Sequence, residues 1–295
     1  MKDSHRKSGL VLVALAIVVF SAIFVCGCTG NSGVDNPSST TEATKATVQT
    51  LTVTGSTTVL PIAQAAAEAY METNKYADIQ VSGGGSGVGV QAVGTGTADI
   101  GMASRDLKAS ESEEYPNLVQ HVIAGNGIAL VVYKDNPVDS LTLAQIKLIY
   151  KGEITNWNQV GGNDMEIVVV GRDSSSGTRE FFYESVMDEE NFVSTQLEKN
   201  SNGAVAQTVS QTPGAIGYLS MGYLDDSLKA LDINVDGTLI EATVDNVLSG
   251  KYPVARNLNM FTNGEASGLA ADFLAYILGS DGQVIVVEEG YVPVA

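Results

Sequence analysis

A short segment at 171–179, with the sequence GRDSSSGTR, combines arginine, hydroxyl and glycine residues. The apolar run before it predicts a buried strand at 166–171, and the apolar spacing after it predicts a helix at 178–188. The first N–H groups of a helix lack partners and carry a partial positive charge, so they bind anions. The guanidinium of Arg172 adds a full charge with a planar geometry suited to an oxyanion. The segment therefore predicts an oxyanion site, although a Ser/Thr helix cap beside a surface ion pair would use the same residue types.

Two other segments repeat the order of strand, glycine and hydroxyl loop, and helix. In the first, a strand at 51–54 leads through Gly55-Ser56-Thr57-Thr58 to a helix at 60–72. In the second, a strand at 78–82 leads through a glycine-rich loop containing Ser86 to a helix at 87–95. Each loop alone is ordinary turn chemistry. Together, the three loops would direct helix-end N–H groups and hydroxyls to one place, where glycine lets the backbone approach a ligand.

The order of these motifs resembles that of the substrate-binding proteins of phosphate ABC importers. The resemblance extends from about residue 50 to the C-terminus and includes segments 97–105, 127–130, 154–157 and 214–218. It implies an α/β fold of the two-lobed, type II periplasmic-binding-protein kind, in which each lobe is a mainly parallel sheet flanked by helices. It also implies that the lobes close around a dehydrated phosphate. A binding protein for another oxyanion, such as sulfate, molybdate or tungstate, is the alternative.

The resemblance also implies which residues contact the phosphate. Better-known relatives have an aspartate that accepts the phosphate proton, and Ser104 stands at that position here. The acceptor is therefore missing, supplied by Asp106 after a local shift, or replaced by Asp173, and we expect Asp106 before Asp173. The candidate phosphate-binding residues are Ser56, Thr57, Thr58, Ser86, Ser104, Arg105, Asp106, Arg172, Ser176, Gly177 and Thr178.

The N-terminal segment predicts export and a lipid anchor. Three basic residues precede an apolar stretch at 10–25, and Cys26-Gly27-Cys28 follows it. This pattern resembles the lipobox of prokaryotic lipoproteins, so we expect residues 1–27 to be a signal peptide and Cys28 to carry lipid. The domain would then lie at the outer face of the cytoplasmic membrane. A retained transmembrane helix is the alternative, although the apolar stretch is shorter than the roughly 20 residues usually needed to span a bilayer.

The rest of the chain divides by composition and by pattern. Residues 28–49 are rich in Ser, Thr, Gly and Asn, which predicts a flexible linker. Beyond them, strands and helices alternate, which favours parallel sheets covered by helices. The resemblance implies two crossings between lobes, so we expect residues 50–127 and 240–295 to form lobe I and residues 128–239 to form lobe II. Further strands are expected at 98–102, 127–133, 214–218 and 256–261, and further helices at 142–150, 202–211, 243–249 and 266–279.

Charge and residue inventory argue against other classes of function. The 16 basic and 34 acidic residues of the chain become 13 and 33 once residues 1–27 are removed, a net charge of −20. Such a domain would repel nucleic acid. His121 would be the only histidine left, and no Cys/His cluster or phosphate-binding Gly-x4-Gly-Lys loop is present. We therefore expect no enzyme, metal or cofactor, but a monomer that binds inorganic phosphate and meets the ABC permease subunits and, through its lipid, the membrane.

Overall fold

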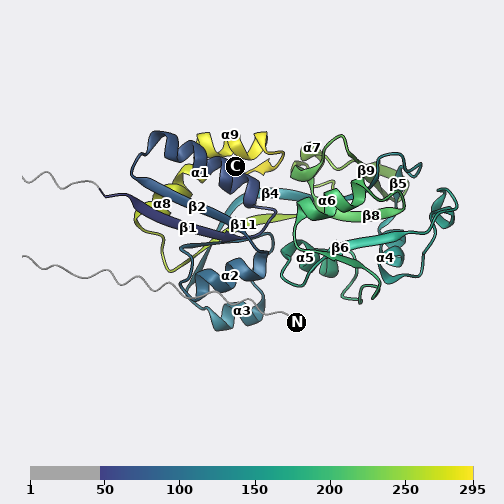
Figure 1. The fold of residues 1–295 in the computed structure, drawn as a ribbon, viewed down its shortest axis with the longest axis horizontal. Helices are drawn as coiled ribbons and strands as arrows, with labels where there is room; N and C mark the ends of the chain where they lie inside the picture. Colours follow the sequence, from purple (N-terminus) through teal and green to yellow (C-terminus); the bar gives the residue numbers. More distant parts are fainter. Residues whose placement is uncertain (1–46, 295) are drawn as a thin grey trace, which may run out of the picture. The chain divides into compact units, whose positions relative to one another are not determined.

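The computed structural model describes residues 47–294. The expected signal peptide, Cys28 and most of the expected linker lie outside the described residues. The described chain forms an α/β structure with two lobes lying side by side (Figure 1). Two long strands, β4 (Leu118–Tyr133) and β11 (Ala255–Asn263), join the lobes.

Strand β4 belongs to both lobes. Its first part pairs antiparallel with β11 as far as Gly127, and its second part, from Ile128, pairs antiparallel with β8 (Ala215–Ser220). We propose that the chain first crosses between lobes at residues 127–128, where the sequence predicts a crossing. The return was expected near residue 240, whereas Tyr252 and Val254 pack in the core of the second lobe. We propose that the chain returns at residues 254–255.

Lobe I is a sheet in the order β2-β1-β3-β11-β4, in which β2, β1 and β3 are parallel and β11 is antiparallel to its neighbours. Apolar side chains of the sheet pack against α1, α8 and α9 on one face, and a smaller cluster packs against α2 on the other. The elements are β1 (Gln49–Gly55), α1 (Leu60–Thr73), β2 (Ala77–Gly83), α2 (Ser86–Gly94), β3 (Ile100–Ala103), α3 (Ala109–Glu114), α8 (Gly268–Leu278), α9 (Ser280–Glu288) and β12 (Val292–Pro293).

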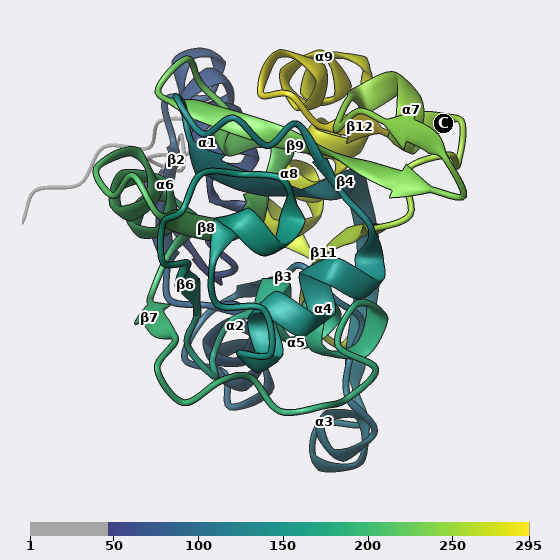
Figure 2. The ribbon, with the colours of Figure 1, turned by 90° about the vertical axis from the view of Figure 1, so that its right-hand side faces the viewer.

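Lobe II has apolar cores on both faces of its sheet. Along β4, Ile128 and Leu130 face one core and Ala129 and Val131 face the other, as the period of two in a strand requires. Helices α4 and α5 pack in the first core and α6 in the second, and Figure 2 shows them on either side of β8. The elements are β5 (Ser140–Leu141), α4 (Leu143–Lys151), η1 (Trp157–Val160), β6 (Val168–Arg172), α5 (Gly177–Ser185), β7 (Leu197–Lys199), α6 (Asn202–Ser210), η2 (Met221–Tyr223), β9 (Leu228–Val235), β10 (Thr238–Ile240) and α7 (Val244–Leu248).

Between residues 47 and 294, no single helix is long and apolar enough to cross a membrane. The pair α8 and α9 reaches the required length and hydropathy together, but the two helices meet at an angle of 63°. Their buried residues, among them Phe273, Ile277 and Val286, belong to the core of lobe I. The apolar character of this pair is therefore explained by packing within the lobe.

Candidate functional site

Four strand-to-helix loops meet where the lobes face each other. The loops before α1 and α2 come from lobe I, and those before α5 and α6 come from lobe II. Each of these helices begins at the carboxyl end of a strand, so its unpaired N–H groups point towards the junction. The sequence predicts the first three loops. The fourth, before α6, was not predicted.

One set of contacts joins the first loop to both loops of lobe II. The hydroxyl oxygens of Thr58 and Thr178 lie 3.1 Å apart. The side-chain amide of Asn202, the first residue of α6, donates to Thr57 Oγ1 at 3.3 Å and to Thr58 Oγ1 at 3.0 Å. Asn202 Oδ1 accepts from Ser220 N, which fixes the orientation of the amide. All of these side chains are buried, so a polar cluster lies between the lobes.

A second set of contacts joins the glycine loop to β3 and α5. Ser86 Oγ accepts from Ser104 N at 3.0 Å, and the hydroxyl oxygens of these two serines lie 3.3 Å apart. Gly177, the first residue of α5, lies directly against them. A Cβ atom at Gly177 would come within 2.2 Å of Ser86 Oγ and 3.0 Å of Ser104 Oγ. Only glycine lets this helix start approach the two serines so closely.

Arg172 provides the first charge of the site. It ends β6, and its side chain is 1% exposed. Its Nη2 donates to Thr57 Oγ1 at 3.3 Å, while Nε donates to the carbonyl of Lys199 at 3.1 Å. The hydroxyl oxygen of Tyr218 accepts a hydrogen bond from the backbone N–H of Arg172. Arg172 is therefore held by neutral oxygen acceptors at the edge of the hydroxyl cluster.

Arg256 provides a second charge, which was not predicted from the sequence. It lies in β11 next to the crossing between lobes and is 8% exposed. Its Nη2 donates to Thr178 Oγ1 at 2.8 Å and its Nη1 to the carbonyl of Gly177 at 2.9 Å. The guanidinium also lies over the ring of Phe181, while Nε is buried without a partner. Arg256 thus fixes the start of α5 and points its charge at the same cluster.

No carboxylate neutralises these two arginines. The ion pairs of residues 47–294 involve other side chains, and neither Arg172 nor Arg256 takes part in one. Burial lowers the pKa of Arg172. Burial, and secondarily the charge of Arg172, lowers the pKa of Arg256 to about 9, which is still above neutral pH. Two buried like charges without a counterion are costly, and a bound anion would remove that cost.

Two of the charged residues considered from sequence have their polar contacts elsewhere. Arg105 forms a bidentate ion pair with Glu111, with both N–O distances at 2.7 Å. Asp106 Oδ1 accepts from Gln120 at 2.9 Å and from Asn259 at 3.4 Å. These contacts tie both residues to neighbouring parts of lobe I. A direct contact of either residue with a bound anion stays a prediction, and the hydrogen bonds of the described residues do not connect them to the cluster.

Asp173 stabilises the loop before α5. Its Oδ1 accepts from the backbone N–H of Ser175 at 3.0 Å and from the hydroxyl of Ser175 at 2.6 Å. The same hydroxyl also lies 3.1 Å from the carbonyl of Gly84, across the junction between lobes. Asp173 therefore positions the third loop.

Ser56 and Ser176 have their hydroxyl oxygens engaged by the backbone. Ser56 Oγ accepts from Thr58 N at 3.1 Å, and Ser176 Oγ accepts from Arg179 N at 3.2 Å as the N-cap of α5. Both serines are nearly fully buried beside the cluster. They shape the helix starts and retain their hydroxyl protons for a further acceptor.

Weak sequence signals explain why Asn202 and Arg256 were missed. Asn202 follows β7, a strand of three residues that is too short to show an alternating pattern. Arg256 lies in a strand that the sequence predicts, and an arginine there reads as an exposed residue. An arginine at the start of a predicted strand, together with Ser201-Asn202 before a helical pattern, was the available evidence.

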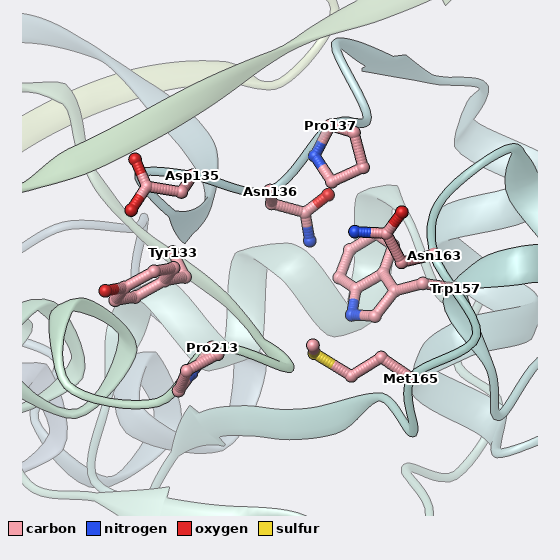
Figure 3. A pocket seen from close by; sticks show the side chains of 8 residues that line it. All are labelled: Tyr133, Asp135, Asn136, Pro137, Trp157, Asn163, Met165 and Pro213. Atoms are coloured by element: carbon pink, nitrogen blue, oxygen red, sulfur yellow. The ribbon is translucent and has the colours of Figure 1, made fainter.

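A separate pocket lies in lobe II and contains none of these residues. It has a volume of about 180 Å³ and is lined by the side chains labelled in Figure 3, including Tyr133, Trp157 and Met165. Trp157 is 1% exposed and donates its indole N–H to the carbonyl of Gly214. It packs in one core with Ile146 and Tyr150 of α4.

Comparison with known sequences gives related proteins over nearly the whole chain. Residues 40–281 match the PBP superfamily domain. The phosphate-binding protein PstS of Bacillus subtilis is 38% identical over 290 residues, which cover 98% of this chain and 95% of that protein. PstS of Borreliella burgdorferi is 32% identical over 82% of this chain and 88% of its own length.

Solved structures give the same result. A phosphate ABC transporter substrate-binding protein from Clostridium perfringens, determined with bound phosphate, superimposes with a TM-score of 0.79 at 39% identity and covers 84% of this chain and 100% of its own. An ABC-type phosphate transport receptor from Vibrio cholerae has a TM-score of 0.68 at 35% identity, covering 83% and 100%. The fold is thus that of a substrate-binding protein of the PBP-like kind. The chain belongs to the PBP superfamily and, within it, to the family of phosphate ABC transporter substrate-binding proteins.

Proposed function

We propose that this protein is the extracytoplasmic phosphate-binding subunit of a phosphate ABC importer. The observation that carries the proposal is the pair of buried arginines, Arg172 and Arg256, which face a cluster of hydroxyls and helix N-termini without a carboxylate partner. An oxyanion supplies the missing negative charge. The related proteins named for phosphate identify inorganic phosphate as the favoured ion over sulfate, molybdate or tungstate.

The residues that would bind the anion come from both lobes. Thr57, Thr58 and Ser86 belong to lobe I, whereas Arg172 and Thr178 belong to lobe II. An anion between them satisfies donors from both lobes at once and so favours the closed arrangement. Each hydrogen bond to a charged group contributes roughly 1.5–3 kcal/mol. A handful of them, less the cost of removing the ion's water, is enough for micromolar binding, about −8 kcal/mol.

We propose transport without catalysis, with the permease subunits as partners of the monomeric closed form. The related proteins are substrate-binding transport proteins. His121, the one histidine among the described residues, lies 3.0 Å from Thr262 Oγ1, and burial lowers its pKa. It has no hydrogen bond to the cluster, which supports a structural role for it.

Phosphate should bind the full-length protein with a stoichiometry of one and raise its melting temperature. At a phosphate concentration a thousand times the dissociation constant, linkage adds about 4 kcal/mol to the free energy of unfolding. For a chain of this size, that corresponds to a shift of about 10 °C. Calorimetric titration and thermal melts of extensively dialysed, detergent-purified protein would measure both quantities. An unchanged melting temperature at millimolar phosphate, with no heat of binding, would contradict the proposed function.

We also propose that Cys28 carries a lipid that holds the domain at the outer face of the membrane. Cys28→Ser should leave the precursor uncleaved or release the protein from the membrane, because lipid attachment requires the thiol. Electrophoretic mobility and membrane fractionation of cells expressing each form would show this, with Cys26→Ser as the matched control that keeps normal processing. A Cys28→Ser protein with unchanged mobility and membrane association would instead support a retained transmembrane helix.

A further inference from the structure

The pocket shown in Figure 3 lies at the opposite edge of the lobe II sheet from the polar cluster. Strand β4 ends at Tyr133 and β8 begins just after Pro213, and both of these residues line the pocket. Arg172 and Ser220, which contact the cluster, stand at the other ends of β6 and β8. A strand rises about 3.3 Å per residue, so the length of β8 alone separates the two places by about 16 Å. The pocket is therefore distinct from the proposed phosphate site.

Most of the lining of the pocket is apolar. The side chains of Tyr133, Pro137, Trp157, Met165 and Pro213 surround it. Met165 is 38% exposed although it is a large apolar side chain, so it has surface left for a ligand to cover. The volume is about 180 Å³. Because a cavity of roughly 150 Å³ holds one benzene molecule, the pocket has room for a single ring with a small substituent.

One buried polar group faces this space without a partner. Asn136 is only 6% exposed, and its Oδ1 accepts from Val138 N at 3.0 Å, which fixes the orientation of the amide. Figure 3 shows the amide nitrogen directed into the space between Tyr133 and Trp157. Among residues 47–294, Nδ2 has no hydrogen-bond partner, while the carbonyl of Asn136 accepts from Lys229 Nζ. A buried N–H group without an acceptor is unfavourable, so a ligand with an acceptor atom would be stabilised here.

The charges around the pocket favour an uncharged ligand. Among the described residues that line it, none is cationic, and the charged one, Asp135, is exposed. In Figure 3 the carboxylate of Asp135 points away from Asn136. The chain has a net charge of −18, so an anion such as phosphate would be repelled. A cation would lose its water without gaining a countercharge inside the pocket.

We propose that this pocket is a second binding site, which takes a small uncharged molecule made of one ring and one hydrogen-bond acceptor, such as a carbonyl oxygen. The ring packs against Met165 and the two prolines, and the acceptor receives the free N–H of Asn136. The site does not depend on the proposed function, because it shares no residue with the polar cluster. It should therefore bind its ligand equally well with and without phosphate.

Trp157 gives a direct signal from this pocket, because it is the only tryptophan in the chain. Its indole N–H therefore gives a single resonance in a spectrum of the full-length protein labelled with ¹⁵N. Benzamide and 2-pyrrolidone, each a ring with a carbonyl oxygen, are the probes. We expect at least one of them to shift this resonance saturably, with a dissociation constant of about 1 mM or below, whether or not phosphate is present.

Benzoate is the control for charge. It has the ring of benzamide but carries a negative charge, so it should bind at least about tenfold more weakly. The absence of a saturable shift with both benzamide and 2-pyrrolidone would overturn the proposal. Binding of benzoate as tightly as benzamide would overturn the assignment of an uncharged ligand.

Asn136→Asp tests the hydrogen bond to the ligand. The aspartate keeps an oxygen for Val138 N but replaces the free N–H group with a second oxygen, so the better probe should bind at least about tenfold more weakly. Asn191→Asp, at an exposed position of lobe II, adds the same charge and should leave the affinity unchanged. An unchanged affinity in Asn136→Asp would overturn the role of this amide.

Met165→Ala covers the case in which Asn136→Asp does not fold, because its side chain is partly exposed. It removes one wall of the pocket, so the better probe should bind at least about threefold more weakly. Leu239→Ala, which shortens another exposed apolar side chain in lobe II, should have no effect on the probe. Calorimetric titration with phosphate should give the same affinity for both variants. A loss of phosphate binding in Met165→Ala alone would overturn the independence of the two sites.

Discussion

Arg172→Ala should weaken phosphate binding by at least about 2–3 kcal/mol, or roughly thirty- to more than a hundredfold. The side chain is 1% exposed and joins β6 to Thr57 across the junction between lobes. Its loss leaves a desolvated anion with only one full countercharge. Arg256→Ala should also weaken binding, since it removes the second charge and frees the start of α5. Calorimetric titration of both variants would measure these losses.

Arg105→Ala is the matched control, because it removes another buried arginine, one that is already neutralised by Glu111. Phosphate affinity should change by no more than about threefold, although the variant loses some thermal stability through the unpaired carboxylate. If Arg105→Ala abolished binding and Arg172→Ala did not, the charge that holds the anion would lie in the β3 loop and not at the end of β6.

Gly177→Ala should prevent tight phosphate binding while leaving each lobe folded. The added Cβ, in lobe II, would lie 2.2 Å from Ser86 Oγ and 2.8 Å from Ser86 Cβ, which belong to lobe I. Contacts shorter than 3.0 Å require atoms to move, and the available movement is separation of the lobes. Because the anion must contact both sides, we expect a loss of at least about tenfold in affinity, equivalent to about 1.4 kcal/mol.

Gly203→Ala provides the matched control at the corresponding end of α6. Its added Cβ would meet only Tyr223 Cε1, at 4.0 Å, which is an ordinary contact distance. Phosphate affinity should stay within about threefold of the original protein, and alanine should slightly stabilise the helix. Equal titration curves for Gly177→Ala and the unsubstituted protein would contradict the prediction. They would show that the loop containing Ser86 and the start of α5 lie further apart than in this structure.

Local sequence patterns account for much of the site. The loops that contain Thr57, Ser86 and Arg172 were predicted because each shows a strand, glycines with hydroxyls, and a helix within about twenty consecutive residues. Asn202 and Arg256 could not be assigned in this way. Their roles depend on contacts with Thr58 and Thr178, which come from distant parts of the chain.

The carboxylate expected near Ser104 shows the same limit. Asp106 lies two residues beyond that serine, but Gln120 of β4 and Asn259 of β11 hold its side chain. Neither partner is close in sequence, so their hydrogen bonds could not be anticipated. Proximity along the chain suggested a contact with the anion, which stays a prediction, and the tertiary neighbours determine the hydrogen bonds that the carboxylate accepts.

The architecture was predicted better than its details. The parallel parts of the sheets, β2-β1-β3 in lobe I and β8-β6-β7 in lobe II, correspond to the alternating pattern. Strands β4 and β11 run antiparallel because they carry the chain between lobes. Short elements such as β5, β7 and α3 have too few residues for a periodic signal and were not predicted.

The position of β11 has a consequence for the order in which the protein can fold. It lies between β3 and β4 in the sheet of lobe I, although it comes from the C-terminal part of the chain. Helices α8 and α9, which complete the same core, follow it. The core of lobe II, in contrast, comes from consecutive residues between Ile128 and Val254. During synthesis from the N-terminus, the core of lobe II can therefore form first. The core of lobe I can be completed only after β11, α8 and α9 have been synthesised.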